Sequence, residues 1–202
     1  MGTRNLICVF YRGRFVIAQY CQWDGYPEGQ GVRILNFLLN SANIDRLKNG
    51  LQFIVTLDQE DLEQFLPSSL PHTHGNCKCG KGEAEPFPPS LSRDSGARIL
   101  EIIAQATAEK RVPIMLDLEF ANDGLFCEWA YVVDLDNNVF EVFGGAVSKD
   151  KAGSDHRFAS VGGERVTVPA LVKSFPFAEL PATEEEFVKI LQDVIGDEEE
   201  EE

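Results

Sequence analysis

Two strand-like runs that follow each other at the N-terminus constrain the fold of this chain more than any other feature. Residues Asn5–Tyr11 are largely apolar, and residues 15–20 form a second apolar run. Arg12, Gly13 and Arg14 separate the two runs, and a short connection containing glycine between two strand-like runs is typical of a β-hairpin. A chain that opens with a hairpin and continues with helical patterns favours an α+β fold built on an antiparallel sheet.

The remaining sequence alternates between helical and strand-like patterns. Helical spacing and capping residues predict helices over residues 32–39, 44–51, 58–65 and 97–110, and a final helix in which Thr183 and Glu186 form a capping box. Strand-like runs predict strands over residues 52–57, 113–120, 125–134, 139–143 and 165–168, with a loop over residues 149–163. We therefore expect an α+β fold in which an antiparallel sheet starts with the N-terminal hairpin and carries helices on at least one face.

Domain organisation follows from two stretches without periodicity. Residues 67–95 are rich in proline and glycine, which predicts a loop-like insertion. Residues 197–202 are all acidic, which predicts a disordered, solvated tail. The prediction is one α+β domain over residues 1–196 that carries the insertion and is followed by the tail.

The charge and the cysteine count exclude several partners and compartments. The net charge is −15, and it falls to −9 without the six acidic residues of the tail. Such a surface repels nucleic acid and anionic lipid, so we expect neither as a partner. No segment reaches the roughly 18 apolar residues of a membrane span, and no signal peptide pattern is present. The five cysteines are odd in number and unevenly spread, which favours free or metal-bound thiols in a reducing compartment and a cytoplasmic, soluble protein.

The connection between the second strand and the first helix is the strongest candidate site. Loops between rigid elements commonly carry binding groups, and this loop combines amides, aromatic rings and one acid. The expected ligand-binding residues are Arg4, Gln19, Gln22, Trp23, Tyr26 and Gln30. We expect Asp24 to be the acid at the centre of the loop and Arg4 to pair with it. These groups suit a small polar ligand of sugar, peptide or nucleoside type. In the alternative interpretation the two rings plug the core and Asp24 belongs to a turn.

A second carboxylate lies on the predicted strand over residues 125–134. Side chains alternate between the faces of a strand, so Glu128 shares a face with Ala130 and Val132 and is expected to be half-buried. With Asp24 it would make a two-carboxylate site for acid–base catalysis. In the alternative, Glu128 meets an arginine or faces solvent. A thiol nucleophile at Cys127 is a weaker hypothesis, because it requires a distant histidine as its partner.

The insertion contains a complete set of zinc ligands by residue type. His72, His74, Cys77 and Cys79 lie within eight residues. A metal would give this coreless segment a centre, and four protein ligands would make the zinc structural rather than catalytic. The alternative is a metal-free loop, because the ligand spacing is tighter than in common zinc sites. No other cofactor is expected.

Three motifs resemble a family of short uncharacterised proteins from bacteria and their phages, with occasional fungal members. The motifs are Met1-Gly2-Thr3-Arg4-Asn5-Leu6, the block Ala18-Gln19-Tyr20-x-Gln22-Trp23-Asp24-Gly25-Tyr26-Pro27-x-Gly29-Gln30-Gly31, and Glu128-Trp129-Ala130-Tyr131-Val132-x-Asp134. The resemblance covers the N-terminal fifth of the chain and a short block near residue 130. It implies kinship and brings no activity with it. The insertion and the acidic tail are additions to the usual pattern.

The N-terminal hairpin also resembles the start of N-terminal-nucleophile hydrolases of the proteasome type. The resemblance implies a layered sandwich fold and cleavage before Thr3, whose hydroxyl would act as the nucleophile and whose amine would act as the base. Gln19 stands where that family presents an aspartate, and no lysine precedes Lys48. Alternatively, residues 2–4 simply lead into the first strand.

Two functions of different classes follow from these residues. The first is a hydrolase that acts on a small polar substrate through Asp24 and Glu128. The second is a non-catalytic module that binds a ligand or a protein through Trp23 and Tyr26 as anchors. The oligomeric state stays open. The geometry around the two carboxylates distinguishes the hypotheses, because a two-carboxylate site needs both groups in one cleft.

Overall fold

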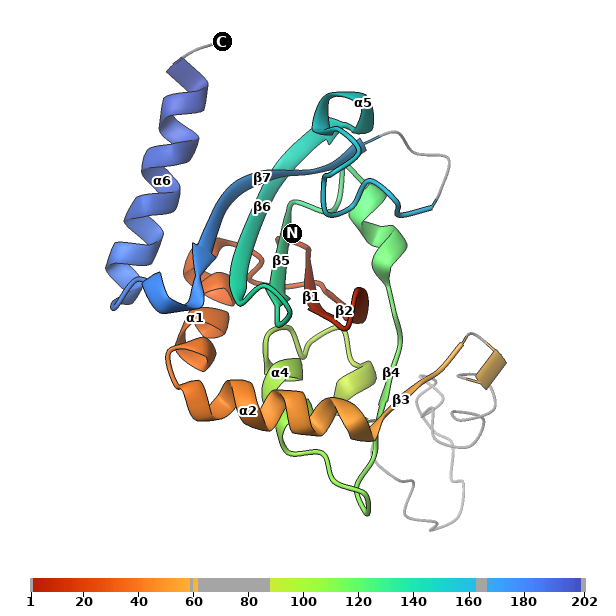
Figure 1. Cartoon of the computed structure of the whole chain (residues 1–202). Helices are drawn as coiled ribbons and strands as arrows, with labels where there is room; N and C mark the ends of the chain where they lie inside the picture. The colour runs from red at the N-terminus through yellow and green to blue at the C-terminus, as the bar shows by residue number, and fades with distance from the viewer. Residues whose placement is uncertain (1, 59, 62–87, 163–166, 201–202) are drawn as a thin grey trace, which may run out of the picture.

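A five-stranded mixed sheet forms the centre of the α+β fold (Figure 1). The computed structural model describes residues 2–58, 60–61, 88–162 and 167–200, with the backbone alone for residues 197–200. The order across the sheet is β2-β1-β5-β6-β7. The strands are β1 (Asn5–Tyr11), β2 (Arg14–Cys21), β5 (Trp129–Asp134), β6 (Val139–Ser148) and β7 (Thr167–Pro176).

The N-terminal hairpin is confirmed. β1 and β2 pair antiparallel, and Arg12 and Gly13 form the two-residue turn between them. Both turn residues have positive φ angles, 55° and 75°, which is the conformation of the hairpin turn that matches strand twist. The carboxylate of Asp136 accepts hydrogen bonds from the backbone N–H groups of both residues, at 2.9 and 2.8 Å. The turn is thereby tied to the neighbouring connection between β5 and β6.

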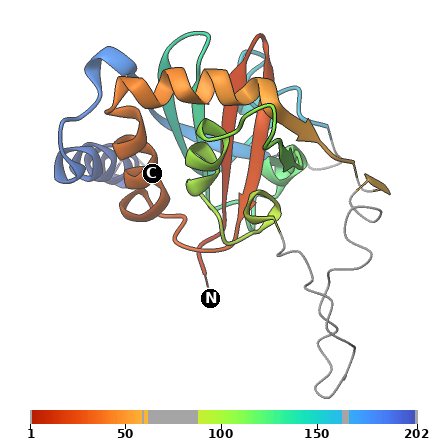
Figure 2. The ribbon, with the colours of Figure 1, turned by 90° about the horizontal axis from the view of Figure 1, so that it is seen from below.

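One parallel pair explains why the sheet is mixed. β1 pairs parallel with β5, whereas the other neighbouring pairs of this sheet are antiparallel. β2 ends at the end of the sheet where β5 begins, but β1 lies between these two strands, and the long connection from β2 to β5 carries helices. These helices are α1 (Val32–Leu38), α2 (Ser41–Gly50) and α4 (Arg98–Ala104), and α6 (Glu184–Glu200) joins them at the C-terminus. Figure 2 shows them on one side of the strands.

The two faces of the sheet carry separate apolar clusters. Side chains alternate along β1, so Ile7 and Val9 meet the helices while Leu6 and Cys8 face the other way. The larger cluster includes Leu35, Ile99 and Phe187 of the helices. The smaller cluster lies under the 3₁₀ helix η4 (Leu118–Asn122) and under residues 153–162, which follow the short helix α5 (Lys149–Ala152).

The outer edge of β2 is covered by the chain that follows a small parallel ribbon. β3 (Ile54–Thr56) pairs with β4 (Val112–Ile114) in this ribbon. Beyond β4, Leu116 bridges to Ala18 of β2. Asp117 donates its backbone N–H to the Ala18 carbonyl at 2.8 Å. Covering an edge strand in this way prevents it from pairing with other chains.

Several predicted boundaries are wrong. The strand over residues 113–120 is limited to β4, and the helix over residues 97–110 ends at Ala104, because Thr107 and Lys110 form a turn closed by the Thr107 hydroxyl. β5 starts at Trp129 rather than at residue 125. The expected loop over residues 149–163 opens with α5. β6 and β7 are longer than predicted, because backbone irregularities near Gly144 let their pairing continue.

The side chains of Thr183 and Glu186 cap the start of the C-terminal helix, but Glu186 meets the N–H of Ala182 rather than that of Thr183, which a standard capping box requires. The backbone N–H of Glu186 donates to the Thr183 hydroxyl at 3.2 Å, and the Glu186 carboxylate accepts from the N–H of Ala182 at 3.0 Å. α6 extends through Glu200, so it includes residues 197–200 of the expected tail. Most of the helix predicted over residues 58–65, and the insertion as far as residue 87, lie outside the described residues.

Candidate functional site

The predicted binding loop lies at the end of the sheet where β1 and β5 begin. It leaves β2 after Cys21 and passes through one π-helical turn, η1 (Pro27–Gly31), into α1. Such turns are rare and often occur at functional sites. Asp24 has a positive φ angle of 56°. A Cβ atom on Gly29 would lie 2.2 Å from the Asp24 carbonyl oxygen, so only glycine allows this close return of the chain.

The backbone carbonyl of Trp23 is the centre of a partly buried hydrogen-bond network. It accepts hydrogen bonds from Asn5 Nδ2 at 3.3 Å, from Gln30 Nε2 at 3.1 Å and from the Cys21 thiol at 3.3 Å. Next to it, the Tyr131 hydroxyl donates to the Gly25 carbonyl at 2.7 Å. These bonds hold the loop in one conformation on the sheet.

The amides that we expected to meet a ligand bind the chain itself. Gln19 Nε2 donates to the Ser92 carbonyl at 3.1 Å. The oxygen of the buried Gln30 amide accepts the backbone N–H of Ala97 at 2.8 Å. Gln22 adds a backbone hydrogen bond to the Arg93 carbonyl at 3.1 Å. The loop is therefore a clamp for residues 88–97, which are the end of the insertion and the two residues before α4.

Trp23 and Tyr26 are exposed, unlike the buried amides of Gln19 and Gln30. Their exposed fractions are 46 % and 54 %. The Trp23 indole N–H donates to the Asp94 carboxylate at 2.9 Å, and the ring contacts Gly2, where a Cβ atom would lie 2.2 Å away. Neither ring plugs the core, so that alternative interpretation is wrong for both.

Arg4 does not form the predicted ion pair. Asp24 lies 3.7 Å from Arg33, and both side chains are more than half exposed. The guanidinium of Arg4 instead lies 4.3 Å from the ring centroid of Phe126, and its backbone N–H donates to Glu128 at 3.2 Å. Arg4 thus connects the loop end of the sheet to the segment before β5.

The two predicted catalytic carboxylates hold separate partners. Glu128 is exposed and bonded to the backbone of Arg4, and Asp24 is exposed beside Arg33. The neighbouring Cys127 is buried, and burial together with the charges of Asp123 and Glu128 raises the pKa of its thiol to about 12. This thiol therefore stays protonated near pH 7, where a thiol nucleophile must ionise.

Sequence reasoning missed a charged network on the other face of the sheet. Asp134 is fully buried at the end of β5, and Arg157 lies 2.7 Å from it. Burial acts to raise the pKa of Asp134, but hydrogen bonds from Asn137 and the charge of Arg157 outweigh it and hold this pKa below its ordinary value. The only signal in the sequence was the alternation of side chains along β5, which places Asp134 on an apolar face. An acid buried on such a face requires a charged or polar partner on the same face.

The zinc hypothesis falls outside the described residues. His72, His74, Cys77 and Cys79 all belong to the part of the insertion that the structure does not describe. Among the residues that it does describe, no group of three or more histidine, cysteine, aspartate or glutamate side chains is arranged to hold a metal. The zinc site stays a prediction, which the zinc content of the purified protein tests.

Comparisons with known proteins add no family to this geometry. No protein family model, no curated protein and no solved structure matches the chain. None of the described helices is both long enough and apolar enough to cross a membrane.

Proposed function

We propose that this protein is an interaction module that binds a partner protein at the end of the sheet where β1 and β5 begin. We call this surface the aromatic end and define it by Trp23, Tyr26, Leu125 and Phe126. The observation that carries the proposal is the exposure of Trp23 and Tyr26 on a loop that is otherwise held by buried hydrogen bonds. Rigid, exposed aromatic rings are the residue type that most often anchors protein interfaces.

The aromatic end continues from the loop to the segment before β5. Leu125 is 76 % exposed, and Phe126 is exposed beneath the Arg4 guanidinium. β1 and β5 are adjacent parallel strands, so the segments that precede them lie side by side. Exposed apolar side chains are thereby collected at one end of the sheet, which is typical of a contact surface.

The charge of the chain selects the chemistry of the partner. The net charge is −15, and Asp24, Glu28, Asp94 and Glu128 lie in or beside the aromatic end. Fields of this sign attract cationic partners and speed their encounter. We infer that the partner presents an apolar side chain flanked by lysine or arginine.

A carboxylate hydrolase is less well supported and stays a prediction. Acid–base chemistry benefits from desolvation of one carboxyl group and from a second one in the same cleft. Asp24 and Glu128 are exposed and engaged with different partners. Hydrogen bonds to Ser92 and Ala97 already use the amides of Gln19 and Gln30, which leaves the rings and carboxylates for a partner.

Titration calorimetry with synthetic peptides tests the module. The probes are short peptides with one leucine or phenylalanine among lysines, and the same peptides with glutamates in place of the lysines. We expect only the lysine peptides to bind. Tyr26→Ser should weaken their binding by about tenfold, which corresponds to about 1.4 kcal/mol.

Leu39→Ser is the matched control, because Leu39 is also exposed but lies at the end of α1. It should leave the affinity unchanged. The proposal is contradicted if neither peptide set binds, if both sets bind equally, or if Tyr26→Ser binds as tightly as the unchanged protein.

A further inference from the structure

We propose that a pocket on the second face of the sheet binds an uncharged nucleoside through its base. The pocket has a volume of about 470 Å³ and is open on one side. Its wall comes from β1, the β1–β2 turn, β6, β7 and residues 155–160. Phe10 and Gly13 place it near the end of β1 that lies away from the aromatic end. The proposal is therefore independent of the proposed interaction module.

Arg157 forms a fixed cationic group in this pocket. Its Nε and Nη2 atoms donate to both oxygens of Glu141, at 2.7 and 2.9 Å, and Nη2 also donates to Asp134 at 2.7 Å. The guanidinium lies 4.8 Å from the ring centroid of Phe10. With two carboxylates and a ring around it, the side chain cannot swing away, which is the preorganisation that binding sites need.

The remaining nitrogen of Arg157 is the donor for a ligand. A guanidinium carries five N–H groups, and Nη1 holds two of them. Within the described residues, no hydrogen bond uses Nη1, and the Arg157 side chain keeps 16 % of its surface exposed. The two N–H groups of one guanidinium nitrogen point in different directions, so Nη1 suits a single carbonyl oxygen on the ligand.

Aromatic side chains provide flat walls beside this donor. His156 lies edge-on to Phe143, with ring centroids 5.5 Å apart. His156 Nδ1 accepts the backbone N–H of Phe158 at 3.2 Å. Burial lowers the pKa of His156, which favours the neutral form of the ring. With Phe10 and Leu171, it makes a surface for the face of a planar ring.

The charges around the pocket exclude anionic ligands. Glu141 and Asp155 line the pocket together with Arg157, and Asp134 and Glu141 bind the Arg157 guanidinium, so carboxylates outnumber the arginine there. A phosphate would meet this excess as well as the negative field of the whole chain. Asp155 and the Ser160 hydroxyl instead accept N–H or O–H groups. A neutral base offers a carbonyl oxygen to Arg157 and an amino group to Asp155 or Ser160. The volume of the pocket lies in the range of small-molecule sites.

Titration calorimetry of the full chain with cytidine and guanosine tests the proposal, and cytidine monophosphate serves as the anionic comparison. We expect at least one nucleoside to bind with a Kd below about 1 mM. The monophosphate should bind at least fivefold more weakly, because the carboxylates repel its charge. Leu171→Glu changes a half-exposed side chain at the pocket and should abolish binding without disturbing the core. Asp155→Ala should weaken binding by about tenfold, the loss typical of one strong hydrogen bond.

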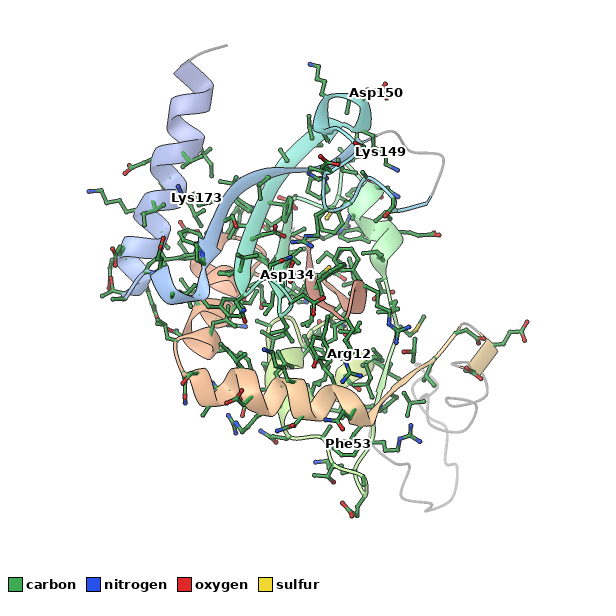
Figure 3. All side chains as sticks on the ribbon, viewed as in Figure 1. Arg12, Phe53, Asp134, Lys149, Asp150 and Lys173 are labelled. Carbon is green, nitrogen blue, oxygen red and sulfur yellow. The ribbon has the colours of Figure 1, made fainter. Side chains whose placement is uncertain are left out.

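The matched control is Asp150→Ala. Asp150 projects from α5 at the top of Figure 3, and it does not belong to the pocket wall. Its removal should leave nucleoside affinity unchanged, as should Tyr26→Ser at the aromatic end. The proposal is overturned if neither nucleoside binds, if the monophosphate binds as tightly as cytidine, or if Leu171→Glu binds like the unchanged protein.

Discussion

The Gln19–Gln30 loop and the Arg157 pocket, at opposite ends of β1, differ in how visibly the sequence marks them. The loop collects amides, rings and an acid in one continuous stretch, yet its amides hold residues 88–97 of the same chain. The pocket is assembled from β1, β6, β7 and a polar segment that shows no motif. A dense polar motif thus marks a place where the chain must bind itself, as well as a place where it could bind something else.

The largest expected effect concerns Arg157. Arg157→Met should lower the free energy of unfolding by about 3–5 kcal/mol, because it leaves the buried Asp134 carboxylate without a cation. Arg33→Met is the control, since Arg33 meets Asp24 in an exposed pair, and should cost no more than about 1 kcal/mol. Urea denaturation measures both. Equal losses at the two positions would show that the charged network of the pocket stabilises the fold no more than the exposed ion pair of the loop does.

Asp134 extends the same comparison to pH. Its pKa in the folded protein lies below the ordinary value, so its contribution to stability is present above about pH 4 and disappears as the pH falls through the folded pKa. Asp134→Asn should therefore cost about 2–3 kcal/mol near neutral pH, since hydrogen bonds to charged groups are worth about that much. The difference from the unchanged protein should shrink in acid. Denaturation at several pH values checks this, and a difference independent of pH would contradict it.

Gln30 measures how strongly the loop holds its own chain. Gln30→Leu removes the acceptor of the Ala97 N–H and one donor to the Trp23 carbonyl in a buried place. We expect a loss of about 1–3 kcal/mol in the free energy of unfolding, the cost of buried polar groups left unpaired. Gln22→Leu should cost less than about 0.5 kcal/mol, because Gln22 binds the Arg93 carbonyl through its backbone. If the two variants lose the same stability, the clamp does not depend on the Gln30 amide.

The hairpin, the α+β class and the capped start of α6 could be predicted because each rests on local chemistry. Two short apolar runs and a turn containing glycine specify β1 and β2, and Thr183 and Glu186 mark the start of α6. The lengths of β6 and β7 depend on their pairing with each other, which a local pattern does not contain. β7 even carries Pro169 and Pro176, which a strand at the edge of a sheet tolerates.

The candidate sites show the same limit. Residue type identified Trp23 and Tyr26, and the structure leaves both rings exposed. Residue type could not reveal that Gln30 would meet Ala97, which lies 67 residues further along the chain. It also could not place Arg157 beside Glu141, because that contact depends on how residues 153–162 return to the sheet. Side chains that meet only through the topology carry no signature in sequence spacing.

The smallest expected effect concerns Asp24, the acid that the sequence marked most clearly. Asp24→Asn should change the free energy of unfolding by less than about 1 kcal/mol, because the pair with Arg33 is exposed and asparagine tolerates the positive φ angle at this position. The same chemical change at Asp134 is expected to cost more, so the two variants form a matched pair in one urea series. A larger loss at Asp24 than at Asp134 would reverse the comparison, because the exposed acid of the loop would then stabilise the fold more than the buried acid of β5 does. A small loss at Asp24, combined with unchanged binding of the lysine peptides, would leave Trp23 and Tyr26 as the groups on which the aromatic end depends.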